Sequence, residues 1–396
     1  MIQTISLGDL IKDIAMGPFG SNLKVDNFIE SGVPVVKGGN LYSYEVGGNF
    51  SFVSEKKAQS LKRSLAYPDD IVITHRGTLG QVSIVPRNGF PYYLASQSQL
   101  RLTPDKTKIN PRYLLYYLRS SIGQFELMQH ASQVGVPSIA TPTKAIKSLK
   151  ITFPELDSQK KIVEILSSLD EKIELNRQMN ETLEQMGQSL FRHYFIDNPE
   201  AERWGILPLD NEQILKVIKP RINKFDGYKN YIATANVSNN NVVGNLEIIS
   251  SEKRPSRANM QPVCGSIWFS KMIGEHKAII IDELDDEIID DSILSTGFMG
   301  LLPKDKYKYY IWSFINSNIF AFEKRSLATG AVMVALNNGS FSKINIKIPP
   351  ECVLVDFNIK VTDLYKLFSV NSRETKVLTT LRDTLLPRLI SGKTKV

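Results

Sequence analysis

The sequence predicts an α+β fold in which two mixed α/β units are repeated in tandem and separated by two long helices. Short runs rich in β-branched residues alternate with helical stretches, which indicates mixed secondary structure. Segments far apart in the chain match at a nearly constant offset, which indicates an internal repeat. A polar but regularly amphipathic stretch, residues 174–191, lies near the middle of the chain and indicates a helix between two globular parts.

Length and composition limit the classes of protein that the chain can form. The 396 residues are too many for one ordinary domain, and 42% hydrophobic with 22% charged residues is typical of a globular chain. Neither a run of 18 apolar residues nor a secretory signal is visible, so we expect a cytoplasmic protein with no membrane partner. The two cysteines, Cys264 and Cys352, favour a reducing compartment. The net charge of +7 suits a polyanionic partner without requiring one.

The repeat is clearest where two proline-ended strands precede the predicted helices. Pro154 falls on Pro349 (349 − 154 = 195), and upstream Asn40 falls on Asn236 (236 − 40 = 196). The matched blocks keep their order along the chain, and small changes of offset are what loop insertions produce. Each copy therefore consists of a globular unit followed by a long helix.

Four segments follow from this repeat. The first globular unit spans residues 1–153 and the first helical segment 154–197; the second unit spans 198–348 and the second helix with a C-terminal tail 349–396.

Within the first unit, residues 70–74, 82–86 and 100–104 read as strands because they are rich in β-branched residues, and residues 111–129 read as a helix.

The ends of the long helices follow from capping residues and prolines. The first should start near Asp157 or Ser158, which are good N-cap residues, and should end before the Asn198–Pro199 pair. The second should begin after Pro350, and Pro387 should kink or end it.

A partner is needed by each helix, since an isolated amphipathic helix of this kind is not stable in water. The apolar residues of the second helix follow the alternating three- and four-residue spacing of coiled coils, and the nearest partner of each helix is the other copy, in an antiparallel arrangement. We expect Asn176 and Asn371, at matching mid-helix positions, to approach across this seam. The alternative is that each helix packs flat on its own unit. The predicted interface residues, between the helices or with a partner, are Leu169, Ile173, Asn176, Met179, Leu183, Met186, Leu364, Phe368, Asn371, Leu378 and Leu381.

Motifs for catalysis are missing from the sequence. The chain has no Asn-Pro-Pro-Tyr/Phe motif for amino-group methylation and no Gly-x-x-x-x-Gly-Lys-Ser/Thr loop for ATP hydrolysis. The four histidines have no metal-ligand spacing. We therefore predict no catalytic residue, no metal site and no cofactor.

Three stretches carry a family resemblance. "GPFGSNLK" near the N-terminus, "ITFPELDSQKKIVEILSSLDEKIELNRQMNETLEQMGQSLFRHYF" in the middle and "LRDTLLPRLISGK" at the end resemble the specificity subunits of type I restriction–modification systems. The resemblance covers nearly the whole chain. It departs from the family pattern at "ELDSQKK", where the family tends to carry Glu-Gln before the helix.

The resemblance implies a non-catalytic DNA-reading subunit with two target recognition domains. Each would read one half of a bipartite double-stranded DNA site, and the helices would set the gap and bind two methyltransferase subunits. Restriction subunits would join them, and these partners would use S-adenosylmethionine, ATP and Mg. Two alternatives remain open: a specificity subunit of a type IIB-like system, and a DNA-binding adaptor without sequence preference.

DNA contacts are predicted from polar and basic loop residues, some of which lie at matching places in the two copies. Asn can read adenine, and Arg and Lys can read guanine or hold phosphate. The candidates are Ser21, Asn22, Lys24, Lys37, Asn40, His75, Arg76, Thr234, Asn236, Lys253, Arg254, Arg257 and Lys271.

Overall fold

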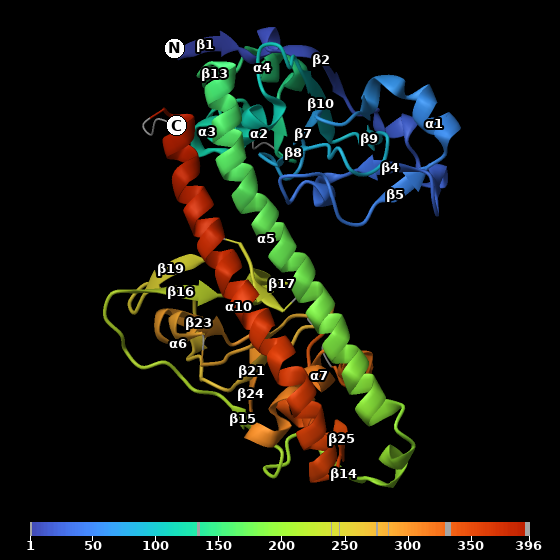
Figure 1. Cartoon of the computed structure of the whole chain (residues 1–396), viewed down its shortest axis with the longest axis vertical. Helices are drawn as coiled ribbons and strands as arrows, with labels where there is room; N and C mark the ends of the chain where they lie inside the picture. Colours follow the sequence, from blue (N-terminus) through green and yellow to red (C-terminus); the bar gives the residue numbers. More distant parts are fainter. Residues whose placement is uncertain are drawn as a thin grey trace. The chain divides into compact units, whose positions relative to one another are not determined.

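The computed structural model describes residues 2–132, 135–238, 240–244, 246–274, 276–283, 285–328 and 334–392. The chain forms two compact units. Unit 1 comprises Met1–Ile173 with Val377–Val396, and unit 2 comprises Glu174–Lys376. Two long helices, α5 (Leu156–Phe191) and α10 (Glu351–Ile390), each contribute residues to both units (Figure 1).

Unit 1 contains two main sheets (Figure 1). The first, which is antiparallel, has the order β2 (Ile11–Met16), β10 (Gln99–Pro104), β7 (Ile71–Thr74), β8 (Val82–Ile84). The second has the order β3 (Phe28–Ile29), β5 (Ser51–Val53), β4 (Val33–Val36), β9 (Tyr93–Ala95), β6 (Leu65–Ala66), with β4 and β9 parallel. Two short ladders pair β1 (Gln3–Ser6) with β13 (Lys150–Phe153) and β11 (Ala131–Ser132) with β12 (Ser138–Ile139). The helices are α1 (Glu55–Ser60), α2 (Pro111–Arg119), α3 (Ser121–Met128) and α4 (Pro142–Ser148).

Local sequence explains the elements that carry the core of unit 1. β7 and β8 are buried along their whole lengths, in keeping with their Ile and Val content. Helix α2 begins where Asn110 accepts hydrogen bonds from the Arg112 and Tyr113 amides, with Pro111 at the first helical position. The predicted helix over 111–129 is thus two helices, which break at Ser120, the N-cap of α3.

Unit 2 repeats the same plan. One sheet has the order β15 (Leu215–Ile218), β24 (Phe298–Pro303), β21 (Ile267–Ser270), β22 (Ala278–Ile280). The other has the order β19 (Glu247–Ser250), β16 (Tyr228–Ile232), β23 (Ser292–Ser295), β20 (Ala258–Met260), with β16 and β23 parallel. The short ladders pair β14 (Gly205–Pro208) with β25 (Asn345–Ile348) and β17 (Val237–Ser238) with β18 (Asn241–Val242). The helices are α6 (Asp286–Asp291), α7 (Lys308–Ile315), α8 (Asn318–Leu327) and α9 (Asn338–Phe341).

The predicted α+β repeat is therefore confirmed by strand topology. Each unit has a four-stranded antiparallel sheet of the same order, and a second sheet with one parallel pair at its centre. The strand before each long helix starts at Lys150 in one copy and at Asn345 in the other, which is the predicted offset (345 − 150 = 195).

The boundaries of the long helices lie close to the predicted ones, with one exception. α5 starts at Leu156, and after Phe191 it continues as a π-helical turn, Arg192–Ile196. α10 starts at Glu351 and runs through Pro387 to Ile390, so Pro387 does not end it. Gly392 follows with a φ of +70°, a conformation that glycine adopts without strain.

The two helices pair within each unit and also pack on that unit. In unit 2, Asn180 on α5 bonds Ser372 on α10, and Tyr194 in the π-helical turn that continues α5 bonds Asp356 on α10, so the helices run antiparallel. In unit 1, Asp170 on α5 accepts a bond from Arg382 on α10 at 3.0 Å. Residues of both helices join the apolar core of each unit. The pairing and its alternative, packing on the unit, therefore coexist.

Candidate nucleic-acid interface

Asn40 forms a turn at the end of β4 and is almost fully buried, with 3% exposure. Its side-chain oxygen accepts from the Lys37 amide at 2.9 Å, and its side-chain NH2 donates to the Gly47 and Asn49 carbonyls, both at 2.9 Å. Every polar atom of this amide is engaged, so Asn40 shapes the loop. We leave it out of the proposed DNA contacts.

Asn236 makes the matching turn after β16 in unit 2. Its side-chain oxygen accepts from the Ala233 amide at 3.1 Å, and its backbone carbonyl accepts from the Val243 amide at 2.8 Å. The sequence match of Asn40 with Asn236 thus reports a shared loop architecture. Thr234, two residues earlier, is half-buried and lies against Gly297, whose added Cβ would be 3.0 Å from its Cγ2.

In unit 1, two loops meet on the turn between β9 and β10. The Gly17 amide donates to the Gln99 carbonyl at 2.8 Å, and a Cβ at Gly17 would lie 1.8 Å from the Ser96 oxygen. The His75 amide donates to the Ser98 carbonyl at 3.0 Å. The "GPFGSN" loop and the "HRG" loop therefore share one edge of unit 1, and the close approach at Gly17 admits only glycine. We call this edge, formed by residues 17–24, 37–40, 74–81 and 96–99, the unit 1 loop edge.

His75 and Arg76, neighbours on this edge, have different environments. His75 is buried, its Nε2 lies 3.2 Å from the Gln97 carbonyl, and burial lowers the pKa of its imidazole. A neutral, buried imidazole is a poor phosphate ligand, so His75 supports the loop. The Arg76 side chain is exposed. It extends from a backbone bridge to Ser138 and remains a candidate for DNA contact.

Two glutamines, Gln81 and Gln99, support the loop edge through hydrogen bonds, and they were not among the residues predicted from the sequence. The Thr74 hydroxyl donates to Gln81 Oε1 at 3.1 Å. Gln99 is buried, and in the amide orientation that satisfies its neighbours it donates to the Val36 carbonyl at 3.3 Å and accepts from the Gly38 amide at 3.1 Å. The Gln99 bonds join the start of β10 to the end of β4, and the Thr74–Gln81 bond joins the end of β7 to the loop before β8. Because Gln99 connects segments distant in sequence, no local motif marks it.

The remaining unit 1 candidates lie at the rim of the edge. Asn22 and Lys24 are exposed, and the side chain of Ser21 lies outside the described part of the structure. Lys37 is exposed, donates from Nζ to Ser51 Oγ at 2.7 Å and lies 4.6 Å from the centre of the Phe28 ring. Lys37 therefore has a partly fixed position.

Lys271 in unit 2 occupies the place that His75 occupies in unit 1. Its amide donates to the Gly297 carbonyl and its carbonyl accepts from the Leu336 amide, both at 2.9 Å. The side chain is half-buried; burial lowers the pKa of its ammonium group, and the neighbouring charge of Lys219 adds to this. Two lysines close together at one edge indicate a place for an anion.

The basic loop 251–257 contains two exposed cationic side chains and one that is hydrogen-bonded within the unit. Lys253 and Arg257 are exposed. The Arg254 guanidinium donates to the Ala258 carbonyl at the start of β20. Arg254 thus holds the loop in place, while Lys253 and Arg257 are available for phosphate contacts.

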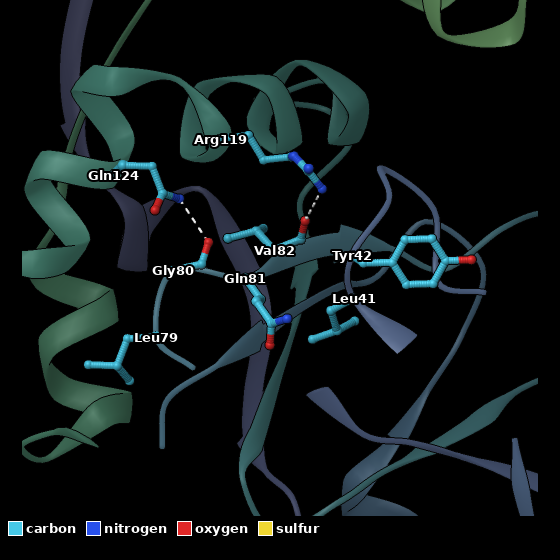
Figure 2. Close-up of a pocket in the computed structure, with 8 residues that line it drawn as sticks. All are labelled: Leu41, Tyr42, Leu79, Gly80, Gln81, Val82, Arg119 and Gln124. Carbon is cyan, nitrogen blue, oxygen red and sulfur yellow. Dashed lines mark hydrogen bonds between the residues drawn. The ribbon is translucent and has the colours of Figure 1, made fainter. Parts of the chain in front are cut away.

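A hollow of about 340 Å³ lies beside the loop edge of unit 1 and is lined by Leu41, Tyr42, Leu79, Gly80, Gln81, Val82, Arg119 and Gln124 (Figure 2). Arg119 on α2 donates to the Val82 carbonyl at 2.9 Å and to the Ser43 carbonyl at 2.7 Å, and its guanidinium lies 4.0 Å from the centre of the Tyr44 ring. Gln124 donates to the Gly80 carbonyl at 2.9 Å. Arg119 and Gln124 therefore brace the loops of this hollow, and Arg119 is not a free cation for DNA.

The helix seam of unit 2 contains a buried run of amides. Asn371 Nδ2 donates to Asn180 Oδ1 at 3.0 Å, and Asn176 Nδ2 donates to Glu374 Oε2 at 2.8 Å. Asn176 and Asn371 are both buried, but each bonds a residue about one turn from the other. Asn176 and Asn371 therefore lie at the same stretch of the seam, as expected, but they do not bond each other directly.

Among the other predicted interface residues, Leu183 and Phe368 are buried, Leu169, Ile173, Met179, Leu364 and Leu378 are half-buried, and Met186 and Leu381 are exposed. The seam also uses residues that the apolar pattern did not mark. Asn180 is a polar residue at a buried position, and Tyr365 takes the buried place expected of Leu364. Gly187 accommodates Tyr365, since a Cβ there would lie 2.4 Å from its hydroxyl oxygen.

No helix in the described ranges is long and apolar enough to cross a membrane. In the same ranges, no group of three or more His, Cys, Asp or Glu side chains could hold a metal ion.

Comparison with known proteins defines the class. The profile of the type I restriction modification DNA specificity domain matches residues 3–185. The specificity subunit of the type I restriction enzyme HindI of Haemophilus influenzae is 23% identical over 77% of this chain and 82% of its own length. The MjaIX specificity subunit of Methanocaldococcus jannaschii is 22% identical over 98% of this chain and 93% of its own length. The fold is similar to that of a type I restriction–modification S subunit from M. genitalium, with a TM-score of 0.55, 16% identity and coverage of 98% and 96% of the two chains.

A DNA specificity domain thus occupies the first unit and the helix that follows it. Along most of its length the chain is similar to type I restriction–modification specificity subunits, which confirms the resemblance inferred from its sequence.

Proposed function

We propose that this chain selects the DNA site of a type I restriction–modification complex by reading two half-sites, one with each unit. The main support is that the two units share the order of their four-stranded sheets and an Asn-stabilised turn. The side chains at the matching loops nevertheless differ. A shared frame with different contact residues suits two different half-sites.

The exposed cations support contact with duplex DNA. In unit 1 the loop edge presents Lys24, Lys37 and Arg76; in unit 2, Lys253 and Arg257 are exposed and Lys271 is half-buried. Such groups hold phosphates and fix the position of a protein on the duplex, while the polar side chains between them reach base edges.

We further propose that α5 and α10 set the gap between the half-sites and bind two methyltransferase subunits. Exposed apolar side chains on both helices support a docking role, because they form a partly apolar surface on otherwise polar helices. These exposed residues are Ile165, Leu175 and Met186 on α5 and Val355, Ile359, Leu367, Val370, Val377 and Leu381 on α10.

Catalysis is assigned to the partners, in keeping with the generally non-catalytic nature of specificity subunits. The methyltransferase subunits would use S-adenosylmethionine, and restriction subunits would use ATP and Mg. The purified chain should neither methylate nor cleave DNA, nor hydrolyse ATP. Activity that persists through repeated purification would contradict this assignment.

Methylome sequencing of cells that express this chain with its methyltransferase tests the proposal. We expect one bipartite motif with methylated adenines in both halves. A short continuous motif would contradict reading by two units, and methylation without sequence preference would favour a DNA-binding adaptor. Excision of the site on both sides by the full complex would favour a type IIB-like system.

A further inference from the structure

Phe19 lies in the "GPFG" loop of unit 1 with 76% of its surface exposed. It follows the end of β2 by three residues. Its carbonyl accepts from the Asn22 amide at 2.8 Å, and the Gly17 amide is bonded to the Gln99 carbonyl. Pro18 fixes one further backbone angle between these bonds. The phenyl ring is therefore exposed to solvent on a backbone that is fixed by hydrogen bonds on both sides of it.

A single exposed apolar residue is ordinary on a protein surface. The surroundings distinguish this one, because Asn22 and Lys24 are exposed in the same loop and the loop rests on the turn that also supports His75. An aromatic ring on an otherwise polar and basic edge is not needed for the core. Covering such a ring is worth about 1.5–3 kcal/mol, which favours a bound state that buries it.

The matching position in unit 2 carries a charged side chain instead of an apolar one. β15 ends at Ile218, and Lys219, Pro220 and Arg221 follow as Gly17, Pro18 and Phe19 follow β2. Arg221 is exposed, and its backbone bridges to Met260 on β20. The same position, preceded by proline in both units, thus presents a guanidinium in unit 2 and a phenyl ring in unit 1.

The two side chains can address different parts of DNA. A guanidinium binds phosphate or the guanine edge, whereas a phenyl ring can bond neither. The apolar group that base edges offer in the major groove is the C5-methyl group of thymine. We propose that Phe19 packs against the C5-methyl group of a thymine in the half-site read by unit 1, and so helps to determine its sequence. The inference rests on the proposed function, since it requires unit 1 to read a half-site.

The test begins with duplexes that the full-length chain, bound to its methyltransferase, selects from a random pool. Each thymine of the unit 1 half-site is replaced in turn by deoxyuridine, which removes only the methyl group. At one position the affinity of the wild-type complex should fall about fourfold, the value of one buried methyl group. The F19A variant should bind the unsubstituted site more weakly and show no further loss at that position. The F19L variant, which keeps an apolar side chain, should still lose some affinity when deoxyuridine replaces thymine at that position.

The control is R221A, at the matching place of unit 2. It should respond to deoxyuridine in the unit 1 half-site as the wild type does. Thermal unfolding of F19A should match the wild type, because the ring is exposed.

Several results would overturn the inference. They are a unit 1 half-site without thymine, no loss on any deoxyuridine substitution, or equal losses in wild type and F19A. A Phe19-dependent rise in 2-aminopurine fluorescence without a methyl effect would show a wedge between base pairs instead, and would also overturn it. Failure to select any bipartite site would contradict the proposed function itself, a result distinct from these.

Discussion

Asn371 on α10 donates a hydrogen bond of 3.0 Å to Asn180 on α5, and both side chains are buried in the helix seam of unit 2. Asn180 also donates to the Phe368 carbonyl at 3.2 Å and to Ser372 Oγ at 2.9 Å. A buried amide pair is costly unless its partners are in register, because an unbonded buried polar group costs about 1–3 kcal/mol. The pair therefore favours one alignment of the two helices over shifted ones.

Breaking this pair on one side should destabilise unit 2. N371A leaves the Asn180 oxygen unbonded and should lower the free energy of unfolding by about 1–3 kcal/mol. The double variant N180L/N371L replaces both partners and should recover most of the loss. Calorimetry of the full chain measures this, with Q178A at an exposed position of α5 as the control. Equal losses in the single and double variants would show that the amides do not act as a pair.

Glu184, one turn beyond Asn180, should make the stability of unit 2 depend on pH. Burial raises the pKa of its carboxyl from the usual value of 4.5 to about 7, and the hydrogen bonds from Gln188 and Asn240 offset this only in part. The protonated form is favoured by folding, so the contribution is complete below about pH 4.5 and is lost as pH rises through about 7.

E184Q should therefore be more stable than the wild type above pH 7, by up to about 3 kcal/mol, and the difference should shrink towards pH 4.5. Melting temperatures measured between pH 5 and 8.5 test this. E171Q, at an exposed position of the same helix, is the matched control and should leave the pH dependence as it is in the wild type. A constant difference between E184Q and wild type across this range would contradict the assignment.

Lys253 and Arg257 should contribute to affinity through phosphates. Replacing both with Ala should lower the slope of log K against log salt by about 2, since each phosphate contact contributes about 0.9, without changing the preferred sequence. R254A should instead lower stability, because its guanidinium is bonded to the Ala258 carbonyl. The K343A variant, at an exposed lysine before β25, should leave the slope unchanged. A changed sequence preference in K253A/R257A would mean that these residues read bases.

The sequence was sufficient for the features that depend on pattern. The offset between Pro154 and Pro349 predicted two copies, and strand order confirms them. Apolar spacing placed Leu183 and Phe368 in the seam, where both are buried. Helix α10 does not end at Pro387, because the end of the helix packs into the core of unit 1, and this packing supports a helix across a residue that disfavours it.

Contacts between distant residues could not be predicted from local motifs. Asn40 looked like a base-reading side chain, but Gly47 and Asn49 occupy its amide. His75 looked like a loop cation, but the fold buries it against the Gln97 carbonyl. Asn180 was not considered, since a polar residue at a core position is recognised only when its partner, Asn371, is known. In each case the role depends on a neighbour far away in the sequence.

The central claim is that two reading units are held at a spacing set by α5 and α10, and a matched insertion tests it most directly. One heptad is added to α5 after Ile173 and one to α10 after Lys376, which leaves the bonded pairs on either side intact, Asp170–Arg382 and Asn176–Glu374. Each helix becomes about 10.5 Å longer. The methylome of cells expressing this variant with the methyltransferase should show the same two half-sites with a gap about three base pairs wider, at about 3.4 Å per base pair. An unchanged gap, or a change in either half-site, would contradict the claim.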